Sequence, residues 1–516
     1  MSSRFPHSLA GRFRSNNRAV VRPVSLPIVW LLAALASFYL VGQEFINPEE
    51  LNKTLPILLM VICAFGAFRL LHLNKDMLWS PIFWFLLTCA GYYGFGPLVY
   101  AFGDPDAVAY AQTFYHIGDA MLLRTNILNA VSILTVCLAF EVGMRWFPFL
   151  GAPTVQPVFE KVALNRFIVI SLALGLFVEY VLADLIAGRF GEYAPSMLLV
   201  FGQLYNFALL LIAYSVFSGE RRWRGVLIGL LIFESLHALT SFGKLGAVWT
   251  GITVFLGLYL AKPRIKYVVW AVVLGTLAYI FILSPVASYG RGEMWMIGDQ
   301  SFMSRINIAK RYITSGAIFS SSEEMTPQGW WTRLNYANAQ AFCIDETDAG
   351  RSQSTLSAAV FSFVPRFLWP EKPDMTLGVM FSIAVTGNPN PTARTAPGIF
   401  AEAYWNGGRW VVLVVCAYVG LLFVVFSHLA MKFVMGFDVR WLPALSNGIF
   451  MAIRPDDWFM ATYVASLPLV IVQIVALHLL FPQSTAQVKP GSCTLEPYDG
   501  SEAIRSVSIR HKKGTH

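Results

Sequence analysis

Residues 409–431 read RWVVLVVCAYVGLLFVVFSHLAM, and this stretch decides the class of fold. It has one cation at its start and no acid, over the length that an α-helix needs to cross a bilayer. Comparable apolar runs recur from Pro27 to Phe481. The whole chain is 56% hydrophobic and only 13% charged, whereas soluble domains contain roughly 25% charged residues. The sequence therefore predicts an all-α polytopic membrane protein.

The apolar runs predict about twelve transmembrane helices, because each run is near the length of a span. They lie near residues 27–46, 55–73, 78–102, 121–143, 166–187, 196–217, 225–242, 245–261, 267–286, 409–431, 441–454 and 458–481. The run at 441–454 is short for a span and is also compatible with a re-entrant segment.

The distribution of basic residues predicts the orientation of these helices. Lysine and arginine gather in the N-terminal segment, in the C-terminal tail and in every second connection, while the other short connections hold only Lys53, Arg189, Lys244 and Arg454. Positive charge favours the cytoplasmic side of a membrane, so both termini are predicted to be cytoplasmic. The net charge of +8 therefore reports topology and contact with anionic lipids rather than nucleic-acid binding.

One of the predicted connections between spans is far longer than the others. Residues 287–408 form a single outer, periplasmic loop, and loops of this length are usually functional. The remaining parts are a basic N-terminus at 1–26, spans 1–9 at 27–286, spans 10–12 at 409–481 and a polar tail at 482–516. Within the loop, Phe302, Ile306, Ala309 and Ile313 repeat at helical spacing, which predicts an amphipathic helix at the membrane interface.

A second part of the loop, residues 361–374, reads FSFVPRFLWPEKPD. Its aromatic residues favour a membrane interface, while Pro365 and Pro370 prevent a continuous helix. We expect an interfacial or re-entrant helix over Leu356–Trp369 that holds Arg366 at the lipid–water boundary.

Several cations of the outer segments are candidates for an anion site, and most of the others in the loop can balance the loop's own acids. Arg366 and Arg394 lie among prolines and apolar residues, where a guanidinium without an anion is costly. Arginine also suits bidentate phosphate binding. Lys244 and Arg189 are the basic groups of two short outer loops, where they either snorkel or complete a cationic ring around the same outer pocket.

Three acids and one histidine near or within the spans are candidates for proton transfer. Glu234 and His237 lie three residues apart on one helix face, and Glu179 lies within a span. Intramembrane ionisable groups either form internal struts or face a functional cavity. His237 and Glu402 are the two candidate general bases.

Other motifs carry less information. Asp104-Pro-Asp106 forms a DxD pair, which suits either a turn or a metal-dependent glycosyltransferase. The P-loop, HExxH and GxSxG motifs are absent, and the six cysteines have neither zinc spacing nor a disulfide pattern.

Residues 180–430 resemble the O-antigen polymerase family, the bacterial oligosaccharide repeat-unit polymerases. The similarity rests on VPRFLWPEKPDMTLGVMF, on the Thr/Gly/Asn/Pro-rich turn that follows it, on PGIFAEAYWNGG and on SFGKLGAVWTGITVFLGLYLAK before a span. The late, large outer loop is also similar to that family.

The resemblance implies a bacterial inner-membrane glycosyltransferase that uses neither a metal nor another cofactor. It would transfer a glycan from undecaprenyl pyrophosphate to a sugar hydroxyl of a second lipid-linked repeat unit. A chain-length regulator would be a further partner. Arg366, Arg394, Arg291, Lys244 and Arg189 would bind the pyrophosphate. Trp369, Tyr404 and Trp405 would contact sugar or lipid, and Glu402 or His237 would act as the base.

Three alternatives stay open at this point. An O-antigen ligase-like enzyme would use the same donor with another acceptor. A polyprenyl-phosphate-sugar glycosyltransferase would use Asp104 and Asp106, and a transporter would use Glu179 and Glu234 as proton carriers. The few charges within the spans and the lack of an internal repeat argue against transport.

Overall fold

The computed structural model describes residues 26–42, 44–103, 117–147, 161–182, 200–297, 301–314, 330–362, 376–389 and 395–482, with seven single residues between them (105, 108, 109, 112, 115, 364 and 369). Within these residues every regular element is helical. Ten of the described helices are long and apolar enough to cross a membrane, which confirms the prediction of an all-α polytopic protein.

These ten helices match ten of the predicted spans. They are Pro48–Leu73, Pro81–Phe102, Asp119–Trp146, Val162–Leu182, Val200–Phe217, Arg221–Ser241, Lys244–Ala261, Ile265–Met294, Ile399–Gly436 and Met460–Leu480. The other two predicted spans correspond to shorter helices. They are α2 (Leu26–Gly42) with 17 residues and α21 (Leu442–Ala452) with 11 residues. The cytoplasmic location of the termini stays a prediction.

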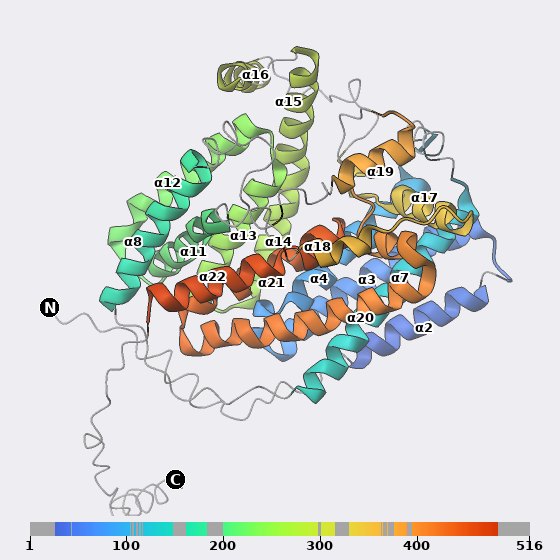
Figure 1. The fold of residues 1–516 in the computed structure, drawn as a ribbon, viewed down its shortest axis with the longest axis horizontal. Helices are drawn as coiled ribbons and strands as arrows, with labels where there is room; N and C mark the ends of the chain where they lie inside the picture. The colour runs from blue at the N-terminus through green and yellow to red at the C-terminus, as the bar shows by residue number, and fades with distance from the viewer. Residues whose placement is uncertain are drawn as a thin grey trace, which may run out of the picture.

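The long helices form two adjoining groups (Figure 1). In the first, α20 (Ile399–Gly436) packs along α7 (Asp119–Trp146), beside α2, α3 (Pro48–Leu73) and α4 (Pro81–Cys89). In the second, α11 (Leu204–Phe217) packs against α8 (Lys161–Phe177), α12 (Arg224–Ser241) and α13 (Lys244–Ala261). The helix α14 (Ile265–Ala278) packs on α13, and α22 (Leu467–Leu480) packs on α21.

Glycines let the main helix pairs approach closely. A side chain at Gly420 of α20 would lie 2.5 Å from the carbonyl oxygen of Val136 on α7. A side chain at Gly257 of α13 would lie equally close, at 2.5 Å, to the carbonyl oxygen of Leu210 on α11. Small residues at helix contacts are the usual packing device in membranes, where burial of apolar surface cannot drive association.

The helix α20 is broken near its start. Gly407 and Gly408 have non-helical dihedral angles, and Gly408 has φ +68°. Glycine adopts this conformation without the strain that a side chain would add. The break coincides with the predicted boundary between the outer loop and the span that begins at Arg409.

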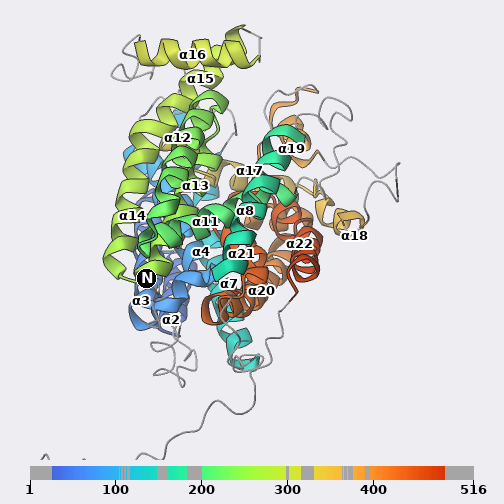
Figure 2. The same ribbon diagram turned by 90° about the vertical axis from the view of Figure 1, so that its left-hand side faces the viewer.

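The predicted outer loop contributes helices at one end of the molecule. The helices α15 (Ser284–Ile297) and α16 (Phe302–Thr314) extend away from the bundle, and α16 lies across the end of α15 (Figure 2). The helix α16 confirms that a helix lies there, but its buried face is not the predicted one. Ile308 and Tyr312 are buried against Phe242, whereas Ile313 of the predicted apolar stripe is exposed. The position of α16 at a membrane interface stays a prediction.

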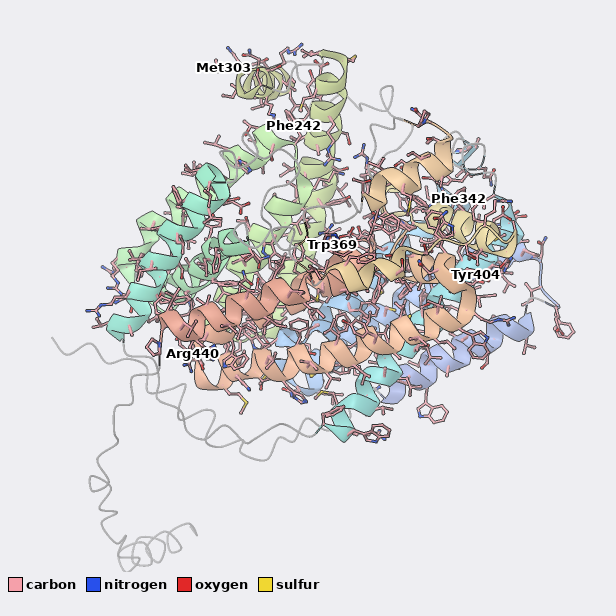
Figure 3. All side chains as sticks on the ribbon, in the orientation of Figure 1. Phe242, Met303, Phe342, Trp369, Tyr404 and Arg440 are labelled. Atoms are coloured by element: carbon pink, nitrogen blue, oxygen red, sulfur yellow. The ribbon has the colours of Figure 1, made fainter. Side chains whose placement is uncertain are left out.

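The helix expected over Leu356–Trp369 is shorter in the structure. A 3₁₀ turn at Thr355–Ala358 continues into α18 (Ala359–Ser362), which ends before Pro365. The ring of Trp369 lies edge-on to that of Phe361, at 5.3 Å between centroids (Figure 3). Two further helices of this segment, α17 (Ala337–Asp348) and α19 (Leu377–Thr386), cover the start of α20 (Figure 1).

Candidate functional site

A cavity of about 1650 Å³ lies between α4, α13, α14 and segments of the predicted outer side. Most of its wall is apolar and comes from side chains such as Trp84, Leu87, Val248, Phe255, Trp270 and Leu274. Four cations line the same cavity: Arg454, which is ion-paired with Asp457, and the three side chains Lys244, Arg291 and Arg333. We call it the cationic cavity, and we call these three side chains the cation cluster. An apolar groove with charge at one place suits a ligand that has both an apolar and an anionic part.

Lys244 is positioned by a buried aromatic anchor. The helix α12 ends at Phe242, which has a left-handed φ of 51° and is 1% exposed. Its ring packs on Gly290 of α15, where a Cβ would lie 2.0 Å from the ring. This contact ties the α12–α13 turn to α15. Lys244 then begins α13 and donates to the Ser284 hydroxyl at 2.9 Å.

Arg333 is positioned by a clamp of aromatic residues. It lies in a 3₁₀ turn at Thr332–Leu334, just after two tryptophans. The indole of Trp331 donates to the carbonyl oxygen of Phe95 at 2.9 Å, and the rings of these two residues stack at 5.1 Å between centroids. Gly96 permits the close approach, because a Cβ there would lie 2.2 Å from the carbonyl oxygen of Leu334.

The cation cluster has no anionic partner within the described part of the chain. None of its three members is within ion-pairing distance of a described carboxylate, and Nε of Arg333 is buried without a hydrogen-bond partner. Burial lowers the pKa of Arg333, and the positive charge of Arg291 lowers it further. Arg333 is half-buried, and an uncompensated charge in such a place is costly to a folded protein. The arrangement therefore favours an anionic ligand.

Two adjacent carboxylates also line the cavity, and they differ in their partners. Asp457 is ion-paired with Arg454 at 2.6 Å. Asp456 accepts a hydrogen bond from the Tyr336 hydroxyl at 3.0 Å through Oδ2, while its Oδ1 is buried without a partner. Of the two, Asp456 is therefore the carboxylate that forms no ion pair with a described cation.

The structure places Glu402 in a closed network instead. Its side chain is 0% exposed and does not line the cavity. One carboxylate oxygen accepts from the Thr355 hydroxyl at 2.9 Å, and the other accepts from the backbone N–H groups of Phe459 and Met460. Asn406 closes the network by donating to Thr355 at 2.7 Å. This placement favours a structural role for Glu402.

His237 also lies away from the cavity. It is exposed on α12, with its ring edge-on to that of Tyr180 at 5.2 Å. Glu234 is buried one turn earlier, where it accepts from the Tyr180 hydroxyl at 2.7 Å and from Thr250 at 3.3 Å. Glu179 lies near this group and, like Glu234, is not part of the cavity wall.

The predicted sugar contacts lie apart from the cavity as well. Tyr404 and Phe342 are at the opposite end of the molecule from Arg440 (Figure 3). The Tyr404 hydroxyl donates to Asp348 at 3.1 Å, beside an ion pair of Asp348 with Arg124. Trp405 is fully buried against Phe342 and Phe381, so it is a core residue. Trp369 contacts α18 and does not line the cavity.

Five residues singled out in the sequence lie outside the described residues: Arg189, Arg366, Arg394, Asp104 and Asp106. Two of the predicted pyrophosphate ligands, Lys244 and Arg291, do lie together in the cavity. Thr395 and Ala396, which follow Arg394 in the chain, also line it.

Sequence reasoning missed Arg333 and Asp456. In the sequence, Arg333 is one of the loop cations that the loop's own acids can balance, and Asp456 lies in a short outer connection without a recognised motif. The signals that could have found them are the pair Trp330–Trp331 beside an arginine in a polar stretch and the charged run Arg454-Pro-Asp-Asp in a short outer connection.

Comparison of the chain with protein-family models, curated protein sequences and solved structures finds no match. The function of the site is therefore argued from its own residues.

Proposed function

We propose that the protein is a membrane glycosyltransferase that polymerises lipid-linked oligosaccharides. It would transfer a growing glycan from a polyprenyl pyrophosphate, undecaprenyl pyrophosphate in bacteria, to a sugar hydroxyl of a second lipid-linked unit. The observation that carries the proposal is the cation cluster, which lines an otherwise apolar cavity and lacks anionic partners in the described part of the chain.

The leaving group explains why this charge is useful. When the bond between the anomeric carbon and the pyrophosphate oxygen breaks, negative charge develops on the pyrophosphate. Donors already in place at that position stabilise the transition state without reorganisation. The cation cluster can supply such donors, because none of its three members forms an ion pair with a described carboxylate.

The apolar wall explains how the lipid would be held. The side chains of α4, α13 and α14 that face the cavity offer surface for an isoprenoid tail, and each buried CH₂ group contributes about 0.8 kcal/mol. The segments that carry Lys244, Arg291, Arg333 and Asp456 all belong to the predicted outer connections. The proposed reaction would thus take place on the periplasmic side.

Deletion of the gene and gel analysis of the surface glycan test this function. A polymerase deletion leaves single repeat units on the surface. A ligase deletion leaves no surface glycan and accumulates lipid-linked polymer, and an unchanged glycan in the deletion strain contradicts both functions.

Binding of undecaprenyl pyrophosphate to the purified protein in nanodiscs tests the site itself. We expect Arg333→Ala to weaken binding by about tenfold or more, because a charge-assisted contact between a half-buried guanidinium and the phosphate is lost. Arg351→Ala is the matched control, since Arg351 is 59% exposed and paired with Glu346. Equal binding by the Arg333 variant and the native protein would show that the cluster does not hold the pyrophosphate.

A further inference from the structure

We propose that Asp456 is the general base that removes the proton from the acceptor sugar hydroxyl. This inference rests on the proposed function and assigns a role that neither Glu402 nor His237 is placed to fill. Asp456 lines the cationic cavity together with the cation cluster. A base and an anion site in one cavity allow the acceptor hydroxyl and the donor pyrophosphate to meet.

The hydrogen bonds of Asp456 leave one buried oxygen without a partner. Oδ2 accepts from the Tyr336 hydroxyl at 3.0 Å, which fixes the orientation of the carboxylate. Oδ1 is buried and has no hydrogen-bond partner, although such atoms in folded proteins are nearly always paired. An acceptor hydroxyl would supply the missing donor.

The backbone that carries Asp456 is held rigidly. The carbonyl oxygen of the preceding Pro455 accepts from the Tyr93 hydroxyl at 2.5 Å and from the backbone N–H of Ile399 at 3.0 Å. Gly398 makes this contact possible, since its φ is +89° and a Cβ there would lie 3.3 Å from the same carbonyl oxygen. A rigid support of this kind is what catalytic geometry requires.

The surroundings of Asp456 suit a base that works near neutral pH. Burial raises the pKa of Asp456 to about 6, and the neighbouring carboxylate of Asp457 adds to the rise. The Tyr336 hydrogen bond and the charge of Arg454 act in the opposite direction on this pKa. The other ionisable groups that face Asp456 from elements packed around it are Tyr92, Tyr93, Tyr279 and Tyr463.

The proposed step balances in atoms and charge. The hydroxyl oxygen of the acceptor forms a bond to the anomeric carbon of the donor while its proton passes to Oδ1 of Asp456. The bond between that carbon and the pyrophosphate oxygen breaks, and the electron pair leaves with the pyrophosphate. The displaced anion then faces Lys244, Arg291 and Arg333.

The experiment uses the purified full-length protein in nanodiscs with lipid-linked oligosaccharides extracted from the deletion strain. Asp456→Asn keeps an oxygen to accept from Tyr336 but cannot take a proton. We expect a loss of glycan transfer of about 10²–10⁴-fold with binding of undecaprenyl pyrophosphate unchanged within about twofold. Asp345→Asn, a change of an exposed carboxylate on α17, is the matched control.

A second variant separates chemistry from structure. The small side chain of Asp456→Ala leaves space for an added carboxylate, so formate in the buffer should restore part of its transfer activity while leaving the Asn variant inactive. Transfer by Asp456→Asn at the native rate, or an absence of rescue in a folded Ala variant that binds lipid, overturns the assignment of the base. Failure of the native protein to bind undecaprenyl pyrophosphate instead overturns the proposed function.

Discussion

Two regions of the molecule hold charged groups and surround them in opposite ways. In the network around Glu402, both carboxylate oxygens accept hydrogen bonds from protein groups, and Glu402 does not line the cationic cavity. In the cationic cavity, three cations lack described carboxylate partners, and one oxygen of Asp456 lacks a donor. A satisfied buried charge holds the fold together, whereas an unsatisfied one beside a cavity indicates a ligand.

This difference reverses the ranking that the sequence suggests. Glu402 is one of the two predicted general bases and Asp456 is not, although both are carboxylates next to predicted outer segments. They differ in the hydrogen-bond donors that the tertiary structure places beside their carboxylate oxygens. The following experiments test whether the cationic cavity carries out the reaction while the network around Glu402 stabilises the fold.

The largest expected effect comes from removing two members of the cation cluster. We expect the double variant Arg291→Ala/Arg333→Ala to lose glycan transfer by about 10³-fold or more, since each donor to a developing anion contributes about 10²-fold or more. Gel analysis of the polymer, with membrane abundance measured alongside, checks this. Full-length polymer in the double variant would show that the cavity is not the reaction site.

Glu402→Ala should affect stability rather than chemistry. The change leaves the backbone N–H groups of Phe459 and Met460 and the Thr355 hydroxyl without an acceptor. We expect unfolding to become easier by about 3 kcal/mol, which thermal denaturation in nanodiscs measures. Transfer per folded molecule should stay within about twofold of native, and a large loss of that specific rate would instead make Glu402 part of the chemistry.

The pH dependence of transfer should follow Asp456. Its pKa is raised to about 6, and only the ionised carboxylate can take a proton. Transfer should therefore rise as pH increases through 6 and fall by about tenfold per unit at lower pH. The comparison is with Asp456→Asn, whose small residual activity should lose this dependence. The same low-pH limb in the Asn variant would assign the titration to another group.

The apolar wall of the cavity should bind the lipid tail less tightly when a larger side chain fills part of the space. Ala271 on α14 lines the cavity, and Ala271→Trp would displace part of a bound lipid tail. Displacing one or two CH₂ groups costs about 1 kcal/mol, so we expect KM for long-chain lipid-linked substrate to rise about fivefold. A short-chain polyprenyl analogue should show a smaller change, and an equal change for both chain lengths would place the tail elsewhere.

The smallest effect is expected at His237, which is exposed on α12 and does not line the cavity. We expect His237→Ala to keep transfer activity and its pH profile within about twofold of native. Substitutions of exposed residues away from the core and from charged networks usually change stability little. A loss comparable to that of Asp456→Asn would return His237 to the list of bases.

The sequence predicted the helices well because their signal is local. Ten described helices match predicted spans, and the break at Gly407–Gly408 coincides with a predicted boundary. The sequence was less informative about the candidate site. Lys244 stands out as the basic group of a short outer loop, and Arg291 follows from the family resemblance, whereas Arg333 depends on contacts with Phe95 and Gly96 far away in the chain.

The amino-acid sequence by itself determined a polytopic helical membrane protein, because an apolar run long enough to cross a bilayer has few other solutions. It also placed the segments of Lys244, Arg291, Arg333 and Asp456 on one predicted side through the distribution of positive charge. Only the tertiary structure decided that these four side chains share a cavity and that Glu402 does not. The physical reason is that hydrogen-bond satisfaction and proximity depend on residues distant in sequence, which no local pattern records.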